Sequence, residues 1–199
     1  MADRILINEV SPRDGLQGES VRLGLDEKLA LITALVDAGV GAVEATSFVS
    51  PKAVPQMADA DQLYPRLPHA DRVRYSALVP NARGLDRALL AGVHEIALVL
   101  SATDTMNRRN INMSLDETRQ ACVDMIAAAG ARGLRRKAYV AVAFTCPFEG
   151  KVAPARVLEL SQEMFDAGAD EVVIADTIGA ANPQEVQSLM GKCAKAFGA

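Results

Sequence analysis

The stretch ILINEVSPRDGLQ, residues 5–17, joins an apolar, strand-like run to a turn that carries charge. Within it, Arg13-Asp14-Gly15-Leu16-Gln17 places a cation, a carboxylate and an amide directly after the first predicted strand. An arginine beside an aspartate is common on solvated surfaces, so these five residues alone favour a surface ion pair over a site. The rest of the chain reverses that preference.

Strand-like and helix-like patterns alternate along the chain and predict six βα units. The predicted strands are residues 5–10, 41–45, 73–79, 95–100, 137–144 and 171–175. The predicted helices are about 25–38, 53–63, 82–91, 115–129, 153–167 and 183–196. The spacing of Ser114 and Glu117 predicts a capping box at the start of the helix at 115–129. Pro154 and Pro183 lie in the first turns of the last two predicted helices.

Continuously apolar strands joined by helices predict a parallel sheet covered on both faces, either doubly wound or closed as a barrel. No Gly-x-Gly-x-x-Gly turn follows the first strand, and polar residues recur after several strands instead of at one switch point. This favours a barrel. A TIM (β/α)8 barrel has eight units in about 250 residues. We therefore expect an α/β chain with about six units of a TIM barrel.

The composition excludes several classes of protein. With 199 residues, of which 50% are hydrophobic, the chain can form the core of one domain. A net charge of -4 and a pI near 5.3 argue against nucleic-acid or membrane-surface partners. Without a membrane-length apolar run or a signal peptide, a cytoplasmic protein is expected. The three widely spaced cysteines (Cys122, Cys146 and Cys193) favour a reducing compartment.

Six motifs together resemble the hydroxymethylglutaryl-CoA lyase family of TIM-barrel metallolyases. They are SPRDGLQ at 11–17, EATSFVSPK at 44–52, VPQMAD at 54–59, NINMS at 110–114, CPFEGK at 146–151 and DTIG at 176–179. Related synthases share the Arg-Asp-Gly-x-Gln turn, but the 48–57 stretch and Cys146-Pro147 are more particular to the lyases. Val142 and Ala143, which carry no polar group, and the loop at 18–20 depart from the family pattern.

The resemblance implies roles for four residues near the first two strands. Asp14 is the expected metal ligand for Mg²⁺ or Mn²⁺, with a partner for Arg13 or a turn cap as the alternative. Arg13 is expected to contact substrate and to stabilise an enolate oxygen. Glu44 is expected to hold Arg13 or to support the metal shell, and its alternative is a structural salt bridge. Gln17 is expected to orient Arg13 or a substrate oxygen, or else to make a helix-entry hydrogen bond.

The resemblance implies further roles at the later strands. Asp176 is a candidate for proton transfer or for orienting a histidine ligand, and Thr177 for a substrate hydrogen bond, although Asp-Thr is also a common helix-entry cap. Ser47 is placed in the substrate pocket. Asn110, in a predicted basic loop after the fourth strand, is expected to bind CoA, and a solvated loop is the alternative. Cys146 is expected to be an apolar filler in preference to a nucleophile.

The reaction implied is retro-Claisen cleavage of (S)-3-hydroxy-3-methylglutaryl-CoA to acetyl-CoA and acetoacetate, as in leucine degradation and ketone-body metabolism. A lyase for another 3-hydroxyacyl-CoA, such as citramalyl-CoA, and a non-catalytic truncated remnant are the alternatives. The partner expected is a small acyl-CoA, with a homodimer compatible with the resemblance. The family's His-x-His metal motif, its asparagine ligand and its catalytic cysteine would fall beyond Ala199, so residues 1–199 are expected to be an incomplete catalytic domain without turnover of its own.

Overall fold

The computed structural model describes residues 5–69 and 72–198 and has an α/β fold. The chain divides into two compact units, residues 1–97 and residues 98–199. The division falls inside strand β4 (Glu95–Ser101), which therefore contributes residues to both units.

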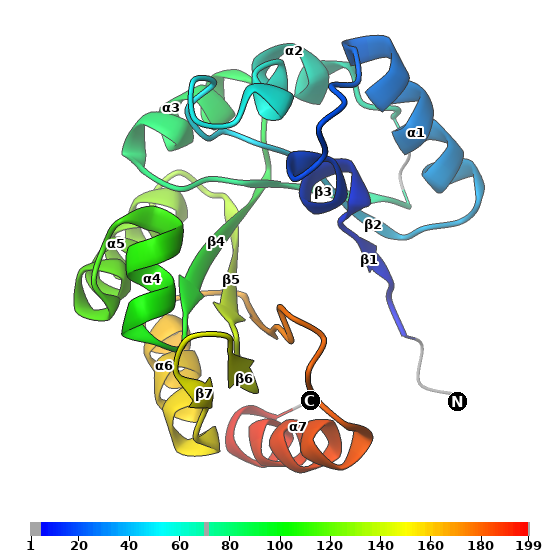
Figure 1. The fold of residues 1–199 in the computed structure, drawn as a ribbon. Coiled ribbons are helices and arrows are strands. Elements are labelled where there is room, and N and C mark those ends of the chain that lie inside the picture. The colour runs from blue at the N-terminus through cyan, green and yellow to red at the C-terminus, as the bar shows by residue number, and fades with distance from the viewer. Residues whose placement is uncertain (1–4, 70–71, 199) are drawn as a thin grey trace. The chain divides into compact units, whose positions relative to one another are not determined.

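In the described part of residues 1–97, the strands follow the order β1-β2-β3-β4, and each neighbouring pair is parallel (Figure 1). Strand β1 is Asn8–Glu9, β2 is Ala42–Ser47 and β3 is Arg74–Leu78. The helices are the π-helical turn η1 (Ser11–Gly15), α1 (Leu25–Asp37), the short 3-10 helices η2 (Pro55–Met57) and η3 (Tyr64–Arg66), α2 (Ala60–Leu63) and α3 (Ala82–Leu90).

The core of this unit explains where Glu44 lies. Val43 and Ala45 of β2 pack with Ile32 of α1 and Leu63 of α2 in one buried cluster. Because successive side chains of a strand point to opposite faces of the sheet, Glu44 lies on the face turned away from that cluster. Every residue of β2 is buried, as expected for a parallel strand covered on both faces.

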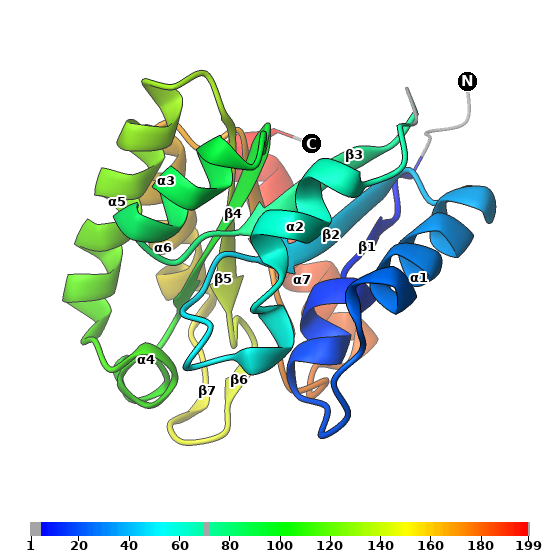
Figure 2. The same ribbon diagram turned by 90° about the horizontal axis from the view of Figure 1, so that it is seen from above.

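Residues 98–198 form the second unit, in which β4 and β5 lie side by side (Figure 2). The sheet order of this unit is β4-β5-β8. Strand β5 is Arg135–Ala141 and β8 is Glu171–Ile174, and the two pair in parallel from Lys137 to Val140 on the β5 side. The helices are α4 (Asp104–Ile111), α5 (Leu115–Gly130), α6 (Pro154–Asp166) and α7 (Pro183–Phe197). A small antiparallel hairpin joins β6 (Thr145–Cys146) to β7 (Gly150–Lys151).

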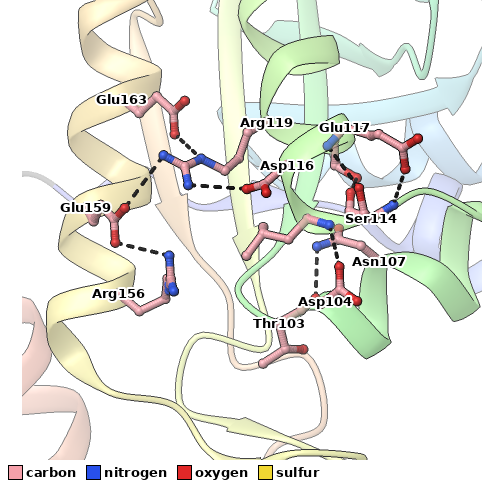
Figure 3. A network of polar contacts seen from close by, with 12 residues as sticks. Thr103, Asp104, Asn107, Ser114, Asp116, Glu117, Arg119, Arg156, Glu159 and Glu163 are labelled. Carbon is pink, nitrogen blue, oxygen red and sulfur yellow. Dashed lines mark hydrogen bonds and ion pairs between the residues drawn. The ribbon is translucent and has the colours of Figure 1, made fainter.

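Polar contacts connect α5 to α6 and define the start of α5 (Figure 3). Arg119 Nε donates to Glu163 at 2.7 Å, and the same guanidinium lies 3.6 Å from Glu159 and 3.7 Å from Asp116. Ser114 and Glu117 form the predicted capping box, with Ser114 N donating to the Glu117 carboxylate at 2.7 Å. These contacts are partly exposed, so each adds little stability, but together they align the two helices.

All six predicted strands are present in the described residues, but several predicted boundaries are wrong. The first strand is confined to Asn8–Glu9, and residues 5–7 are exposed. The predicted helix at 53–63 is divided into η2 and α2, and Pro55 stands at the first position of η2, where its missing N–H costs no helical hydrogen bond. The predicted basic loop after the fourth strand is helix α4, so Arg108, Arg109 and Asn110 lie on a helix.

Candidate functional site

Arg13 is the centre of the polar group in the first unit. It lies on η1, where Val10 O accepts hydrogen bonds from Arg13 N at 3.1 Å and Asp14 N at 2.7 Å. Its Nε donates to Glu44 Oε1 at 2.5 Å, and its Nη2 pairs with the same oxygen. Its Nη1 donates to Asp14 Oδ1 at 2.5 Å. One guanidinium therefore joins two carboxylates, and the predicted proximity of Arg13, Asp14 and Glu44 is confirmed.

The two carboxylates differ in their contact with solvent. Glu44 has an exposed fraction of 0%, so its charge depends on the buried guanidinium of Arg13. The Asp14 side chain is 64% exposed, and its Oδ1 takes the bond from Arg13. The arrangement holds the cation firmly from the buried side and presents Asp14 on the open side, where its carboxylate can meet a ligand.

Four oxygen atoms of this unit are buried and make no hydrogen bond to any described residue. They are Asn8 Oδ1, Gln17 Oε1, Ser47 Oγ and Ser76 Oγ. A buried polar group without a partner is costly, so such groups mark places where ligand atoms or ordered water bind. Ser76 pairs in register with Glu44 across β2 and β3. The sequence reasoning missed Ser76, and a serine in the middle of an apolar strand is the signal that could have found it.

Residues 54–59, which form one of the motifs of the family resemblance, are hydrogen-bonded to helix α1 through a buried lysine. Lys28 of α1 is 2% exposed, and its Nζ donates to Gln56 O and to Asp59 Oδ1, the latter at 2.7 Å. Gln56 Nε2 in turn donates to Glu19 O at 2.8 Å. This motif therefore ties the chain after β2 to α1 and to the loop that follows Gln17.

Glu9 is a second residue that the sequence reasoning missed. Its carboxylate accepts a hydrogen bond from Ser11 N at 2.8 Å, and this backbone bond lowers the pKa of Glu9 below its usual value. The contact fixes the chain between β1 and η1. Glu9 thereby helps to set the start of the turn that carries Arg13.

In the second unit, the polar group lies where β5 and β8 end. Val142 N donates to Thr177 Oγ1 at 2.8 Å. Asp176 Oδ1 accepts from Ala180 N at 3.1 Å, and Asp176 Oδ2 accepts from Ala181 N at 3.0 Å. Asp176 therefore caps the loop that leads to α7, whereas the N-cap of α7 itself is Asn182. Asp176 and Thr177 both follow β8, and both are engaged with backbone amides.

The β6–β7 hairpin packs on the first turn of α4. Thr103 Oγ1 lies 3.1 Å from Cys146 Sγ, and Glu149 accepts from Thr105 N at 2.7 Å. The guanidinium of Arg109 lies 4.5 Å from the centre of the Phe148 ring. Cys146 is 1% exposed, which agrees with its predicted role as a buried filler. Asn110 is exposed on α4, so the structure corrects its predicted place in a loop.

Metal ligands are sparse in this part of the molecule. Among residues 5–69 and 72–198, no group of three or more His, Cys, Asp or Glu side chains could hold a metal ion. His69 and His94 are both exposed. Asp14 fits the role of a single oxygen ligand, but the described residues do not form a complete metal centre. No helix in the same ranges is long and apolar enough to cross a membrane.

The HMGL-like family profile matches residues 4–197, and the chain belongs to this family. It is 39% identical over 191 residues to the hydroxymethylglutaryl-CoA lyase of Pseudomonas mevalonii, covering 96% of this chain and 64% of the relative. It is also 39% identical over 187 residues to the mitochondrial hydroxymethylglutaryl-CoA lyase of Bos taurus, covering 94% and 58%.

Solved structures show the same relationship. The HMG-CoA lyase of Bacillus subtilis matches with a TM-score of 0.93 at 38% identity, covering 98% of this chain and 65% of that one. An HMG-CoA lyase from Acinetobacter baumannii in complex with coenzyme A and 3-methylmalate matches with a TM-score of 0.90 at 34% identity, covering 96% and 62%. The predicted fold is confirmed as α/β with six βα units of a TIM barrel. The chain spans about three fifths of the length of these relatives.

Proposed function

We propose that the protein containing this chain is a hydroxymethylglutaryl-CoA lyase, which cleaves (S)-3-hydroxy-3-methylglutaryl-CoA to acetyl-CoA and acetoacetate. The observation that carries the proposal is the Arg13 guanidinium, held between the buried Glu44 and the exposed Asp14, in a chain 39% identical to such a lyase. Retro-Claisen cleavage leaves a thioester enolate, and a fixed cation is the group that stabilises the developing oxyanion.

Arg13 and Glu44 have different roles in this mechanism: Arg13 stabilises negative charge, and Glu44 holds Arg13 in position. Glu44 fixes the guanidinium through Nε and Nη2, so little reorganisation is needed when negative charge forms on the thioester oxygen. The Arg13 side chain is a planar guanidinium, which offers a fixed cation and several hydrogen-bond donors. It therefore acts by charge and by hydrogen bonds and does not transfer a proton.

Substrate binding is assigned to Gln17, Ser47, Asn110 and Thr177, together with Arg13. The unpartnered oxygens of Gln17 and Ser47 support this assignment, because substrate hydroxyl or amide groups can bind them. The coenzyme A in the Acinetobacter baumannii relative supports an acyl-CoA as the substrate class. For Asp176, the two backbone hydrogen bonds favour an orienting role over proton transfer.

The cofactor proposed is Mg²⁺ or Mn²⁺, with Asp14 as one ligand. Such a cation would lower the pKa of the substrate hydroxyl and make its deprotonation easier. Because the described residues offer no group of three His, Cys, Asp or Glu side chains, they would not complete the metal site alone, and substrate, water or other protein residues would supply the remaining ligands. We further propose a cytoplasmic protein of leucine degradation and ketone-body metabolism, which acts as a homodimer without nucleic-acid or membrane partners.

The test is an assay of the complete gene product, because the chain covers only 58–64% of the curated relatives. The purified protein is incubated with Mg²⁺ and either hydroxymethylglutaryl-CoA or citramalyl-CoA. Acetyl-CoA is quantified in both cases, together with acetoacetate from the first substrate or pyruvate from the second. Cleavage that favours hydroxymethylglutaryl-CoA supports the proposal. A preference for citramalyl-CoA would assign a different substrate, and cleavage of neither would support a non-catalytic role.

A further inference from the structure

Val142 has a backbone conformation that its side chain disfavours. Its φ is 50°, and Asn112 is the other described non-glycine residue with a positive φ. Asn112 ends α4, a position where asparagine tolerates the left-handed region. A β-branched residue in that region is a genuine outlier, and such strain persists where the surrounding structure imposes it.

The contacts around Val142 show what imposes the conformation. On one side, Ala175 N donates to Val140 O at 3.1 Å, and on the other, Ala143 N donates to Ala175 O at 3.1 Å. Between these two bonds, the Val142 amide leaves the strand ladder and donates to the Thr177 side chain at 2.8 Å. The Val142 side chain is fully buried, with an exposed fraction of 0%, which keeps the residue in place.

This bond has a consequence for the hydroxyl group of Thr177. A threonine hydroxyl has one proton to donate and can accept hydrogen bonds through its lone pairs. Val142 N occupies an acceptor position, so the hydroxyl proton stays available to a second partner. Thr177 is exposed, and the loop from 176 to 181 is fixed by the bonds from Ala180 N and Ala181 N to Asp176.

We infer that Val142 is a positioning residue, whose strained amide orients the Thr177 hydroxyl so that it donates a hydrogen bond to an oxygen of the acyl-CoA substrate. The ligand part of this inference rests on the proposed lyase function. The role comes from the Val142 backbone, which is why a residue without a polar side chain can perform it.

The first experiment measures amide hydrogen exchange at Val142 by NMR in the full chain. Thr177→Ser keeps the hydroxyl and Thr177→Val removes it. Thr118→Val is the control and removes the hydroxyl of a different threonine of the same unit, which bonds to Ser114 O. We expect exchange at Val142 at least tenfold faster in Thr177→Val, and within threefold of wild type in the other two variants. An unchanged rate in Thr177→Val would overturn the inference.

The second experiment measures kcat and KM for hydroxymethylglutaryl-CoA with the same variants of the complete gene product. We expect kcat/KM to fall at least tenfold in Thr177→Val and to be largely rescued in Thr177→Ser. Wild-type kcat/KM in Thr177→Val would refute the hydrogen bond to substrate. If the wild-type protein cleaves no acyl-CoA, the proposed function fails, whereas the exchange experiment still decides whether the Val142 amide holds Thr177.

Discussion

At the scale of single residues, the ion pair of Arg13 and Glu44 bears on both the stability of the chain and its proposed mechanism. Glu44 is completely buried, and Arg13 is 8% exposed. A buried ion pair adds little net stability compared with a well-packed apolar pair, but removal of one partner leaves an uncompensated charge. Two such charges in a buried place are therefore better explained by the proposed role of the guanidinium, which is to stabilise an oxyanion, than by a contribution to stability.

Arg13→Gln is expected to lower the free energy of unfolding by about 3 kcal/mol, because the buried Glu44 carboxylate loses its contacts with the Arg13 guanidinium. Urea unfolding followed by circular dichroism measures this change. Adding Glu44→Gln to the same protein should restore at least half of the loss. Arg83→Gln, at an exposed position on α3, is the control, with an expected change below about 0.5 kcal/mol. A double variant as unstable as Arg13→Gln alone would contradict this account of the pair.

In the complete gene product, Arg13→Gln is expected to lower kcat by about 10²–10³ with a much smaller change in KM. The reason is that the charge of Arg13 pairs with an oxyanion that exists only along the reaction path. Steady-state kinetics with hydroxymethylglutaryl-CoA separates the two constants. An unchanged kcat with a raised KM would instead make Arg13 a residue that binds the ground state.

At the scale of elements, the sequence predicted what depends on periodicity and local chemistry. The apolar runs of β2 and β4, and the capping box of Ser114, are local signals. The positive φ of Val142 is not predictable in this way, because its cause is a bond to Thr177, which lies 35 residues later. Helix α4 was missed because its polar composition resembles a loop, and its start is fixed by Glu149 of the distant hairpin.

The candidate site likewise has features that the sequence predicts and features that it does not. Arg13, Asp14 and Glu44 could be predicted to lie together, because each follows or ends a neighbouring parallel strand. The buried hydroxyl of Ser76 could not be recognised as unpartnered without the register that places it beside Glu44. The contacts of Asp176 with Ala180 and Ala181 depend on the path of a loop that periodicity does not describe.

The ion pair of Asp170 with Arg136 joins β5 to the turn before β8, and its contribution to stability should depend on pH. Its carboxylate accepts from Arg136 N and Nε, both at 2.8 Å, and the hydrogen bond from the Arg136 side chain is the main cause that lowers the pKa of Asp170 below 3.8. A lowered folded-state pKa gives stability that is present above pH 3.8 and is lost as the pH falls through the folded-state value.

Asp170→Asn is therefore expected to cost about 0.5–1 kcal/mol at pH 7, a small value because the pair is partly exposed. The difference from wild type should shrink below about pH 4 as Asp170 becomes protonated in the wild-type protein. Urea unfolding from pH 7 to pH 2.5 measures both curves. Asp37→Asn, at the exposed end of α1, is the control, with an expected effect below about 0.5 kcal/mol. A constant difference at all pH values would rule out this ionic contribution.

At the scale of the whole molecule, the chain has the fold of its relatives over about three fifths of their length. That residues 1–199 act together as one catalytic domain stays a prediction. Within the first unit, β1 is the terminal strand of the sheet order and pairs with β2. The residues just before it are apolar and exposed, with values of 87% for Ile5, 50% for Leu6 and 66% for Ile7.

These residues line a groove of about 970 Å³ together with Arg72, Val73 and residues 36–41. A terminal strand beside exposed apolar side chains is a template for association between molecules.

We expect the 199-residue chain to self-associate at micromolar concentration. The double variant Ile5→Lys with Ile7→Lys is expected to shift the chain toward monomer, because charge at such an edge opposes pairing. Sedimentation velocity over a hundredfold range of concentration measures the change. Leu90→Lys is the control, because Leu90 on α3 is 91% exposed. It tests whether added charge at any exposed position is enough to shift the chain toward monomer. A wild-type chain that is monomeric at every concentration, or an equal effect of Leu90→Lys, would show that the 5–7 segment does not drive association.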